Sequence, residues 1–363
     1  MKIFRRITNV YKGTKAVYKL VNDPILSRTY YPEAERKTKF TTWKELMFWL
    51  IKHNEVNELY FTYGLDRKGK DAREIMPYWK FNSLQKRKNR HLPGLTYDYI
   101  CLMRDKFIFA QLLTSLRFPT PKNIALFNKD EITWLDSMQT EPLSSLPGNG
   151  SLNIDAFAKK LAGMVGEGIF PLQIREGKFY SGNIELKLNE LTAKLDGKYL
   201  LQERIIQHPD ISKFHASSVN TIRIITFNNN GRLEVFSSAL RIGANGQSND
   251  NWGTGGIVVG IDKETGKLLE EGVFRQGYGL RAKVHPDSGV VFKDFEIPFY
   301  KESVEQVCKL HSYLPRIQSI GWDIAITPDG PTFVEGNDNW GCGIPMVLEK
   351  DFKTRILQLF QKR

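Results

Sequence analysis

Cysteine and long hydrophobic runs are both scarce in this sequence. Its 363 residues include three cysteines, Cys101, Cys308 and Cys342, which are widely spaced and lack the C-x-x-C pairing of zinc or redox motifs. We therefore expect reduced, structural cysteines. For Cys342 we favour a buried, apolar role over one in chemistry. No run of about 18 uncharged apolar residues occurs, which argues against a membrane-spanning helix.

A signal-peptide pattern is also missing at the N-terminus. The first residues are basic, but no apolar core and no small-residue cleavage site follow them. We therefore expect a cytosolic protein, with peripheral attachment to a membrane as an alternative. The length and the 41% apolar content suit two or three globular domains that bury a substantial core.

Positive charge is concentrated in one part of the chain. The formal net charge is +12, and residues 1–100 hold 21 Lys and Arg against 10 Asp and Glu, so almost all of the excess lies there. Such a region attracts an acidic polymer, an anionic membrane surface or nucleic acid. We rank nucleic acid last, because no zinc-finger spacing or aromatic RNA-binding signature accompanies the charge. A solvated helical surface without a partner is the alternative.

The hydrophobic pattern predicts an α+β protein in three parts. Residues 1–95 form a basic, mainly helical region, in which Thr42 caps a helix whose apolar face includes Trp43, Leu46, Met47, Leu50 and Ile51. A basic run at residues 86–90 precedes a boundary at residues 91–94, where Pro and Gly break the pattern.

The other two parts are residues 96–205 and residues 206–363. In the first, we predict a helix from Asp105, a strand at 123–127, a loop at 140–152, a helix at 154–165 and strands at 170–174 and 199–205. In the second, we predict a β-meander with strands at 221–227, 232–242, 257–262 and from 267 onward. A helix at 303–314 and a last hairpin follow.

That last hairpin carries the chemistry. Its Pro328-Asp329-Gly330 segment suits a three-residue loop, in which Thr327 pairs with Pro331 and Asp323 lies opposite Glu335. Two carboxylates facing each other repel unless solvent or a cation separates them. Asn337 points to the same face and adds a neutral oxygen. These three oxygen donors predict a magnesium site, with a solvent-facing acidic hairpin as the alternative.

The pentapeptide Asn-Asp-Asn-Trp-Gly occurs twice, at residues 249–253 and 337–341. Glycines adjoin both copies, so their backbone amides are candidates to bind phosphate or carboxylate. Two similar turns, each with a buried tryptophan, are the alternative. Arg223 lies on a predicted strand among core-type residues, and phosphate would be a fitting partner for it. Arg241 could act in the same way, with less specific support.

Four segments together resemble the ATP-grasp superfamily, and within it the sugar-transfer-associated ATP-grasp proteins. They are residues 200–209 (LLQERIIQHP), 219–224 (VNTIRI), 321–323 (GWD) and 334–337 (VEGN). The resemblance covers roughly residues 95–345. It implies an α+β ATP-grasp fold in which the nucleotide site lies between two α+β subdomains.

The resemblance also implies roles for individual residues. Asp323, Glu335 and Asn337 become magnesium ligands, and Arg223, with Arg241 as a helper, lies near the transferring phosphate. Residues 201–205 become the hinge that receives adenine through backbone groups of Gln202, Glu203 and Ile205, and Lys106 becomes the first nucleotide lysine. The family's second lysine is assigned to the position of Gln173, with Arg175 or Lys178 as substitutes, which either rewires phosphate binding or signals lost catalysis.

These residues predict an enzyme that uses ATP and Mg²⁺. The first hypothesis is a carboxylate–amine ligase that works through an acylphosphate on small-molecule or saccharide-linked substrates, in polysaccharide or natural-product biosynthesis. A kinase of a sugar or metabolite and a catalytically degenerate nucleotide-binding protein are the alternatives. The six histidines show no metal-ligand spacing, and we interpret His285 as a turn residue rather than a substrate contact.

Overall fold

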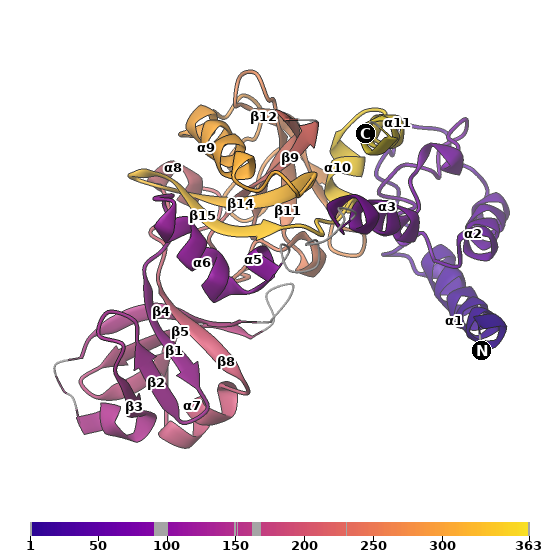
Figure 1. Ribbon diagram of the computed structural model, residues 1–363. Helices are drawn as coiled ribbons and strands as arrows, with labels where there is room; N and C mark the ends of the chain where they lie inside the picture. Colours follow the sequence, from indigo (N-terminus) through magenta and orange to yellow (C-terminus); the bar gives the residue numbers. More distant parts are fainter. Residues whose placement is uncertain are drawn as a thin grey trace.

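The computed structural model describes residues 2–90, 101–148, 150, 152–161, 168–229 and 231–361, and two β-sheets define its architecture (Figure 1). The helices are α1 Lys2–Asn22, α2 Lys39–His53, α3 Tyr78–Arg90, α5 Cys101–Arg104, α6 Lys106–Ser115, α7 Leu188–Lys194, α8 Pro209–Ser212, α9 Tyr300–Ser312, α10 Gly343–Leu348 and α11 Phe352–Gln361, with 3₁₀ turns at Ala72–Glu74, Leu143–Gly148 and Trp252–Thr254. The strands are β1 Asn123–Asn128, β2 Glu131–Trp134, β3 Thr140–Pro142, β4 Ile154–Lys160, β5 Ile169–Arg175, β6 Lys178–Ser181, β7 Ile184–Leu186, β8 Lys198–Glu203, β9 Thr221–Asn229, β10 Arg232–Ile242, β11 Ile257–Ile261, β12 Leu268–Phe274, β13 Arg281–Ala282, β14 Ser319–Thr327 and β15 Gly330–Asn337.

The first sheet contains β1 to β8 and forms a separate lobe at the lower left of Figure 1. Its strand order is β3-β2-β1-β8-β4-β5-β6-β7, and neighbouring strands pair antiparallel. One face packs on α7 through Leu191 and Leu195, which share a core with Phe127, Ala158 and Leu201. Burial of this apolar face stabilises the lobe.

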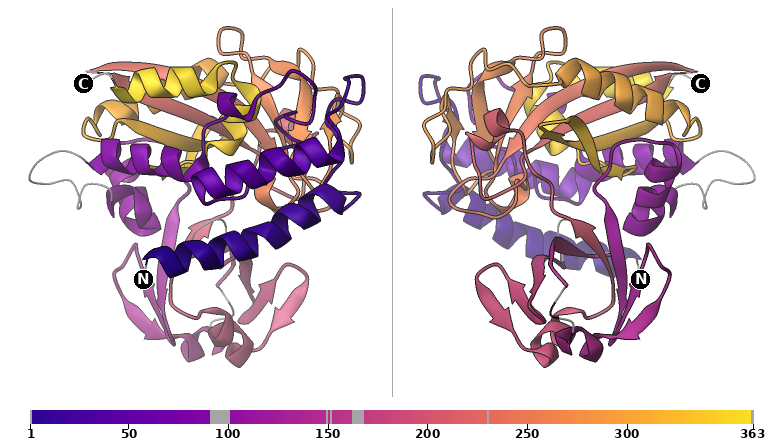
Figure 2. Two further views of the ribbon diagram at one scale, coloured as in Figure 1. Left: turned by 90° about the vertical axis from the view of Figure 1, so that its right-hand side faces the viewer. Right: turned by 90° about the vertical axis from the view of Figure 1, so that its left-hand side faces the viewer.

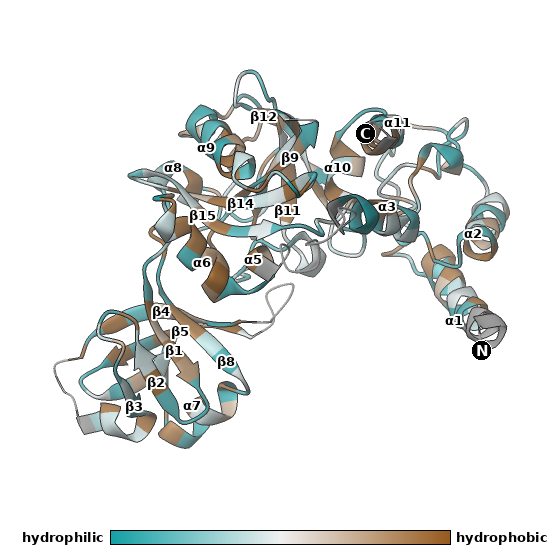
Figure 3. Cartoon of the chain, in the orientation of Figure 1, coloured by the Kyte–Doolittle hydropathy of each residue, from teal (hydrophilic) through white to brown (hydrophobic). Residues whose placement is uncertain are grey.

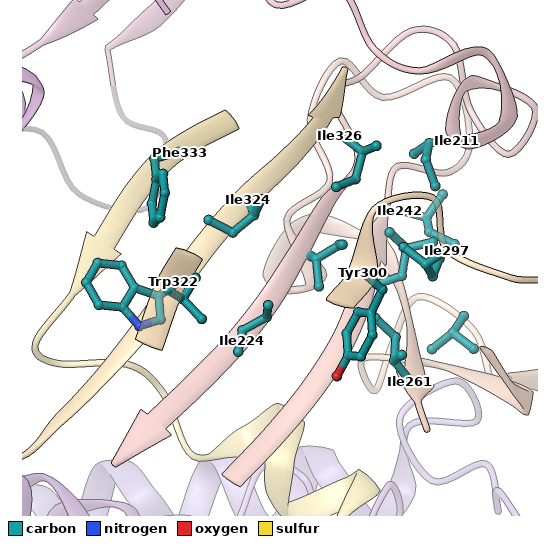
Figure 4. Close-up of a cluster of buried hydrophobic side chains, with 14 of the residues drawn as sticks. Ile211, Ile224, Ile242, Ile261, Ile297, Tyr300, Trp322, Ile324, Ile326 and Phe333 are labelled. Carbon is teal, nitrogen blue, oxygen red and sulfur yellow. The ribbon is translucent and has the colours of Figure 1, made fainter. Parts of the chain in front are cut away.

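The second sheet has the order β13-β12-β11-β10-β9-β14-β15, so β15 is an edge strand. Alternate residues of its strands enter the main core, including Ile224, Trp322 and Phe333 (Figure 4). Helix α9 covers this face together with α5 and α6, which supply Met103, Phe109 and Leu113. Helices α5 and α6 therefore pack with the second sheet, although they precede the first sheet in the chain.

The opposite face of the second sheet is covered by the N-terminal region. Helices α1 and α2 lie side by side (Figure 2), and Val17, Leu46 and Leu50 share a core with Val258 and Val273 of the sheet. The neighbouring part of this face packs on α3 and α11. The predicted helical region thus buries one face against the sheet instead of standing apart.

Two predicted helix starts have different outcomes. Asp105 caps α6 as predicted, because its Oδ1 accepts hydrogen bonds from the backbone N–H groups of Phe107 and Ile108 at 2.9 and 3.0 Å. The cap of α2 is Thr38 rather than Thr42, since Thr38 accepts from the backbone N–H of Thr41 and Thr42 is buried one turn inside the helix.

Other predictions are corrected in the first sheet. Residues 154–160 form strand β4 rather than the start of a helix, and they pair with both β5 and β8. The alternation of buried Ile154, Ala156 and Ala158 with exposed or half-buried neighbours is the period of a strand. The predicted loop at 140–152 contains β3 and a 3₁₀ turn. The predicted boundary at residues 91–94 lies outside the described residues.

The last hairpin brings Asp323 opposite Glu335, as predicted, but by a different route. Thr327 pairs with Gly330, so the loop has two residues instead of three. A β-bulge between Asp323 and Ile324 then shifts the register by one and restores the Asp323–Glu335 pair. The loop is one residue shorter than predicted, and the bulge shifts the register back by one residue, so the predicted Asp323–Glu335 pair forms.

Two further findings in the described residues concern membrane spans and Cys342. No helix there is long and apolar enough to cross a membrane. Cys342 is 1% exposed, and burial raises the pKa of its thiol to about 12, so it acts as a small apolar residue.

Candidate nucleotide site

A pocket lies where the first sheet approaches α6 and the edge strand β15. It encloses about 60 Å³. Strands β4, β5 and β8 line one side and α5, α6 and β15 line the other, through Met103, Lys106, Phe109, Ala110, Thr120, Lys159, Ile169, Leu200, Gln202, Val334 and Glu335. The pocket combines apolar walls with two lysines, an amide and a carboxylate, which is the composition of a site for an anionic ligand with an apolar part.

Lys159 is a partly buried cation of this pocket. It extends from β4, and its Nζ donates to Gln202 Oε1 at 2.6 Å. Gln202 is held in turn from β1, because its Nε2 donates to Asn123 Oδ1 at 3.0 Å and to Pro121 O at 3.3 Å. Burial lowers the pKa of Lys159 to about 8, an effect that the nearby Glu335 charge opposes. The ammonium is therefore poised to gain from an anion entering the pocket.

Lys106 and Glu335 form the other side. Lys106 Nζ lies 3.9 Å from Glu335 Oε1, and both residues line the pocket with Lys159. Glu335 retains 39% side-chain exposure, whereas Lys106 retains 16%. The N-terminal turn of α6 and the edge strand thus place a cation and an accessible carboxylate within reach of one ligand.

A row of alternating charges crosses the adjoining face of the second sheet. Asp323 accepts two hydrogen bonds from Arg223, with Nε–Oδ1 at 2.5 Å and Nη2–Oδ2 at 2.9 Å, and a third from Arg241 Nη1 at 3.1 Å. Arg241 continues the row to Asp250 at 2.7 Å. All four side chains are at most 15% exposed. Arg223, for which the sequence predicted phosphate as a partner, is therefore paired within the chain with the Asp323 carboxylate.

Charges oppose the effect of burial on Asp323 and Arg241, whereas burial raises the pKa of Asp250. Burial alone would raise the pKa of Asp323, but Arg223 and Arg241 outweigh it and lower that pKa below the usual value. Burial would likewise lower the pKa of Arg241, and the charges of Asp250, Asp323 and Glu335 reverse that effect and raise it. Glu335 thus acts on both the row and the pocket.

The aspartate of each pentapeptide copy forms an ion pair with an arginine. Asp250 pairs with Arg241, and Asp338 pairs with Arg104 of α5 at 3.0 and 2.9 Å. Both tryptophans are buried: Trp252 donates to Val273 O and Trp340 to Ser319 Oγ. These contacts match the interpretation of two similar turns with buried tryptophans.

The side-chain oxygens of Asp323, Glu335 and Asn337 differ in how available they are to a magnesium ion. Glu335 and Asn337 lie on β15, opposite Asp323 and Gly321 respectively, and Glu335 is partly open to solvent. Asp323 already accepts three N–H groups, which leaves little of its acceptor capacity for a metal. Glu335 and Asn337 therefore fit a magnesium ligand role, whereas Asp323 fits one only after an arginine turns away.

The remaining predicted nucleotide residues are distributed unevenly. Gln202 lines the pocket, but Glu203 and Ile205 do not, and the backbone N–H of Glu203 already donates to Lys122 O at 2.9 Å. Gln173 and Arg175 lie on β5 outside the pocket lining, and Gln173 donates to Asp155 Oδ1 at 3.2 Å. The assignment of the second lysine position to Gln173 stays a prediction, and among the described residues Lys159, one strand earlier, is the lysine that reaches the pocket from the first sheet.

Lys159 was missed because residues 154–165 were interpreted as a helix. The signal was present in the sequence: an alternating segment, IDAFAKK, ends in lysine and is followed by glycines at positions 163, 166 and 168. Assigning a strand to that alternation places Lys159 and Lys160 on opposite faces. Lys160 indeed pairs with Asp196 at 2.7 Å, away from the pocket.

Two antiparallel sheets with a pocket between them are the arrangement expected from the resemblance to ATP-grasp proteins. The family model of sugar-transfer associated ATP-grasp proteins matches residues 92–361, and the chain belongs to this family. A search among curated proteins found no match.

Several solved structures are similar to this chain at low identity. They include the D-alanine–D-alanine ligase of Helicobacter pylori (13% identity, TM-score 0.40, covering 72% of this chain and 61% of that one) and the D-alanyl-alanine synthetase A of Vibrio cholerae O1 biovar eltor str. N16961 (10%, 0.42, 73% and 65%). A biotin carboxylase complex from Campylobacter jejuni matches at 10% identity and a TM-score of 0.44 (73% and 48%). The chain spans less than two thirds of the length of each.

Proposed function

We propose that this protein is an ATP- and Mg²⁺-dependent carboxylate–amine ligase. Its substrates would be a small-molecule or saccharide-linked acid and amine, in polysaccharide or natural-product biosynthesis. The observation that carries the proposal is the pocket in which Lys106, Lys159 and Glu335 converge between the two sheets. Family membership supports the ATP part of the proposal.

In the proposed reaction, a substrate carboxylate oxygen attacks the γ-phosphorus of ATP, and the bond to the ADP oxygen breaks. The amine nitrogen then attacks the acylphosphate carbonyl, phosphate leaves with the bonding electrons, and the nitrogen loses a proton. Lys106 and Lys159 would neutralise phosphate oxygens, and Gln202 would hold Lys159 in place. Magnesium, held by Glu335 and Asn337, would supply further charge neutralisation at the phosphates.

The row of charges next to the pocket, from Arg223 to Asp250, suits the step in which the acyl group passes to the amine. Arg223 and Arg241 lie on the same face as Glu335, fixed by Asp323 and Asp250. We infer that an incoming phosphate or carboxylate competes with Asp323 for these guanidinium groups. Release of Asp323 would also free its oxygens for magnesium, so the two events support each other.

An ADP-release screen that crosses acids with amines tests the reaction. We expect ADP only when both substrates are present, and none with Glu335→Gln. Glu264→Gln, in an exposed turn between β11 and β12, is the matched control and should keep the activity. ADP formed with an alcohol and no amine would instead support the kinase alternative. Intact ATP binding without ADP release across the panel would contradict both reactions.

The degenerate alternative was motivated by glutamine at the second lysine position. Lys159 supports the ligase over this alternative, because it gives the pocket a cation that could bind phosphate. Calorimetry that detects no magnesium-dependent ATP binding would still favour that alternative.

For the partner of the basic N-terminal region we propose an anionic lipid surface. Helix α2 buries Leu46, Trp49 and Leu50, and on the other side it exposes an apolar stripe of Phe40, Trp43, Phe48 and Ile51, with exposed fractions of 71%, 37%, 63% and 55%. In Figure 3 this helix lies at the far end from the first sheet. Aromatic side chains beside lysines are typical of helices that lie in a membrane interface.

Sedimentation with vesicles tests this partner. The protein should pellet with phosphatidylglycerol vesicles at low salt and not with phosphatidylcholine vesicles, and Phe40→Ser with Phe48→Ser should abolish pelleting. Tyr278→Ser, an exposed aromatic residue elsewhere, is the control. Pelleting that is unchanged by the double substitution, or its absence with anionic vesicles, would contradict the proposal. Retention on a soluble polyanion alone would support the acidic-polymer alternative.

A further inference from the structure

Two buried histidines and an aspartate meet at a place that shares no residue with the lining of the proposed nucleotide pocket. His215 lies between α8 and β9, and His285 and Asp287 lie in the hairpin loop that follows β13. One ligand atom of each of the three side chains lies within 4.8 Å of the others. His285 is fully buried and His215 is 7% exposed, whereas Asp287 faces solvent. None of these residues has a part in the proposed ligase reaction.

Hydrogen bonds determine which nitrogen of each ring carries hydrogen. His215 Nε2 lies 2.7 Å from Gln247 O, and His285 Nε2 lies 2.8 Å from Gly243 O. A carbonyl oxygen can only accept, so both Nε2 atoms are donors. In the neutral rings, both Nδ1 atoms therefore present lone pairs, and that of His285 lies 3.2 Å from the Ser288 hydroxyl, which a metal ion would displace. Metal-binding histidines are commonly oriented in this way, with the second nitrogen donating to a backbone carbonyl.

The lone pair of His215 faces another acceptor. Its Nδ1 lies 3.2 Å from Asp287 Oδ2, and two acceptors at that distance repel each other unless a cation neutralises them. A proton on His215 would satisfy this pair alone. A metal ion would satisfy His215, Asp287 and the Nδ1 of His285 together. A tetrahedral zinc site with bonds of about 2.0 Å requires ligand atoms about 3.3 Å apart. The His215–Asp287 pair already has this spacing, and because all three ligand atoms lie within 4.8 Å of one another, a small side-chain movement would bring His285 to it.

The backbone is shaped to bring these groups together. A Cβ on Gly243 would lie 2.6 Å from His215 Cδ2 and 2.4 Å from Ser218 Oγ, so only glycine allows the loop after β10 to approach His215. The hairpin that carries His285 is closed by hydrogen bonds from His285 N to Val290 O and from Gly289 N to His285 O, both at 2.8 Å. The three side chains thus come from two segments, and the loop after β10 packs against them.

We propose that His215, His285 and Asp287 bind a zinc ion, with the fourth position open to water or to a group of the substrate. Imidazole nitrogens and a carboxylate oxygen are ligands that zinc accepts, and three protein ligands leave one position free. The ion joins the α8–β9 linker to the hairpin at 284–291, and through the two carbonyls it reaches the loop that carries Asp250. That loop fixes Arg241, so the zinc site stabilises the row beside the nucleotide pocket.

Zinc content of untagged protein tests the proposal. We expect about one zinc per chain by mass spectrometry, and weaker binding by about 100-fold or more in Asp287→Asn. Asp210→Asn is the matched control: Asp210 also lies beside a histidine, His208, at 3.8 Å, but no second imidazole joins them, so zinc binding should be unchanged. Cobalt added to the metal-free protein should produce visible absorption in the wild type and in Asp210→Asn only.

A further measurement separates metal binding from folding. Metal-free wild type should remain folded by circular dichroism and should gain melting temperature when zinc is added, whereas Asp287→Asn should not gain it. His215→Gln provides a second ligand variant with the same expectation. Failure of folded, metal-free wild type to bind zinc or cobalt, or equal binding by Asp287→Asn, would overturn the proposal.

Discussion

Lys159 and Lys160 are neighbours in the chain, but they lie in different environments. Strand alternation turns Lys159 into the pocket, where it contacts Gln202, and turns Lys160 toward Asp196 at the surface. A sequence cannot separate the two lysines until the segment is known to be a strand. Substitution of Lys160 is therefore the matched control for substitution of Lys159 in experiments on the pocket.

The titration of Lys159 leads to a pH prediction. Because burial lowers its pKa to about 8, the side chain is a cation below that pH and loses its charge above it. If the cation binds phosphate, ATP affinity should fall about tenfold between pH 7 and pH 9, with proton uptake on binding in that range. Calorimetry in buffers of different ionisation enthalpy measures both quantities. An affinity that is constant across this range, or an equal decline in Lys159→Met, would rule out this role.

The Asp323 carboxylate leads to a stability prediction. Replacing it by asparagine leaves Arg223 without its buried counter-charge, so Asp323→Asn should lower the free energy of unfolding by about 3–5 kcal/mol. Glu185→Gln breaks the exposed pair with Lys178, and it should change that free energy by less than about 1 kcal/mol. Urea unfolding of both variants makes the comparison. Similar losses in the two would show that the row is not a buried, paired network.

Contacts between residues that are far apart in the chain could not be predicted from the sequence. The Asp323–Glu335 pair lies within one hairpin and could be predicted from local alternation. The pairs Arg223–Asp323 and His215–His285 are 100 and 70 positions apart, and they depend on strand order and loop approach. Histidine spacing alone therefore missed the three-residue cluster.

At the scale of elements, strands were predicted well where a turn signal separated them. The β9–β10 hairpin follows from its Asn-rich turn and regular alternation. Strand β4 failed because its short apolar residues also fit a helix, and only pairing with β5 and β8 decides between the two. On α2, the apolar periodicity located the helix, but it put Leu46 and Leu50, which are buried, on one face with the exposed Trp43 and Ile51.

The packing of α5 and α6 on the edge strand leads to a prediction at Gly336. A Cβ there would lie 3.0–3.1 Å from Met103, Trp322 and Phe109, so a side chain would push the helices off β15. Gly336→Val should lower the free energy of unfolding by about 1–3 kcal/mol and weaken ATP binding. Gly341→Val is the control, because a Cβ at Gly341 meets no atom within 4 Å. Equal thermal stability of the two variants would contradict this packing role.

At the scale of the whole molecule, the first sheet joins the second through two connections. One is the segment between α6 and β1, and the other runs from β8 to α8. The pocket volume of about 60 Å³ is far below the roughly 300–1,000 Å³ of pockets that hold small-molecule ligands, so we expect the lobes to part before a nucleotide enters. Sequence patterns predicted most of the second sheet but only β1, β5 and β8 of the first, and the separation of the lobes depends on contacts that no local pattern contains.

The pocket between the lobes is the central claim, and titration of the protein with magnesium and ATP by calorimetry tests it most directly. Wild type and Lys160→Met should bind one nucleotide with equal affinity, and Lys159→Met should bind about 10- to 100-fold more weakly, because it lacks one charged hydrogen bond to phosphate. Absence of binding by the wild type, or equal affinities for Lys159→Met and Lys160→Met, would contradict the claim.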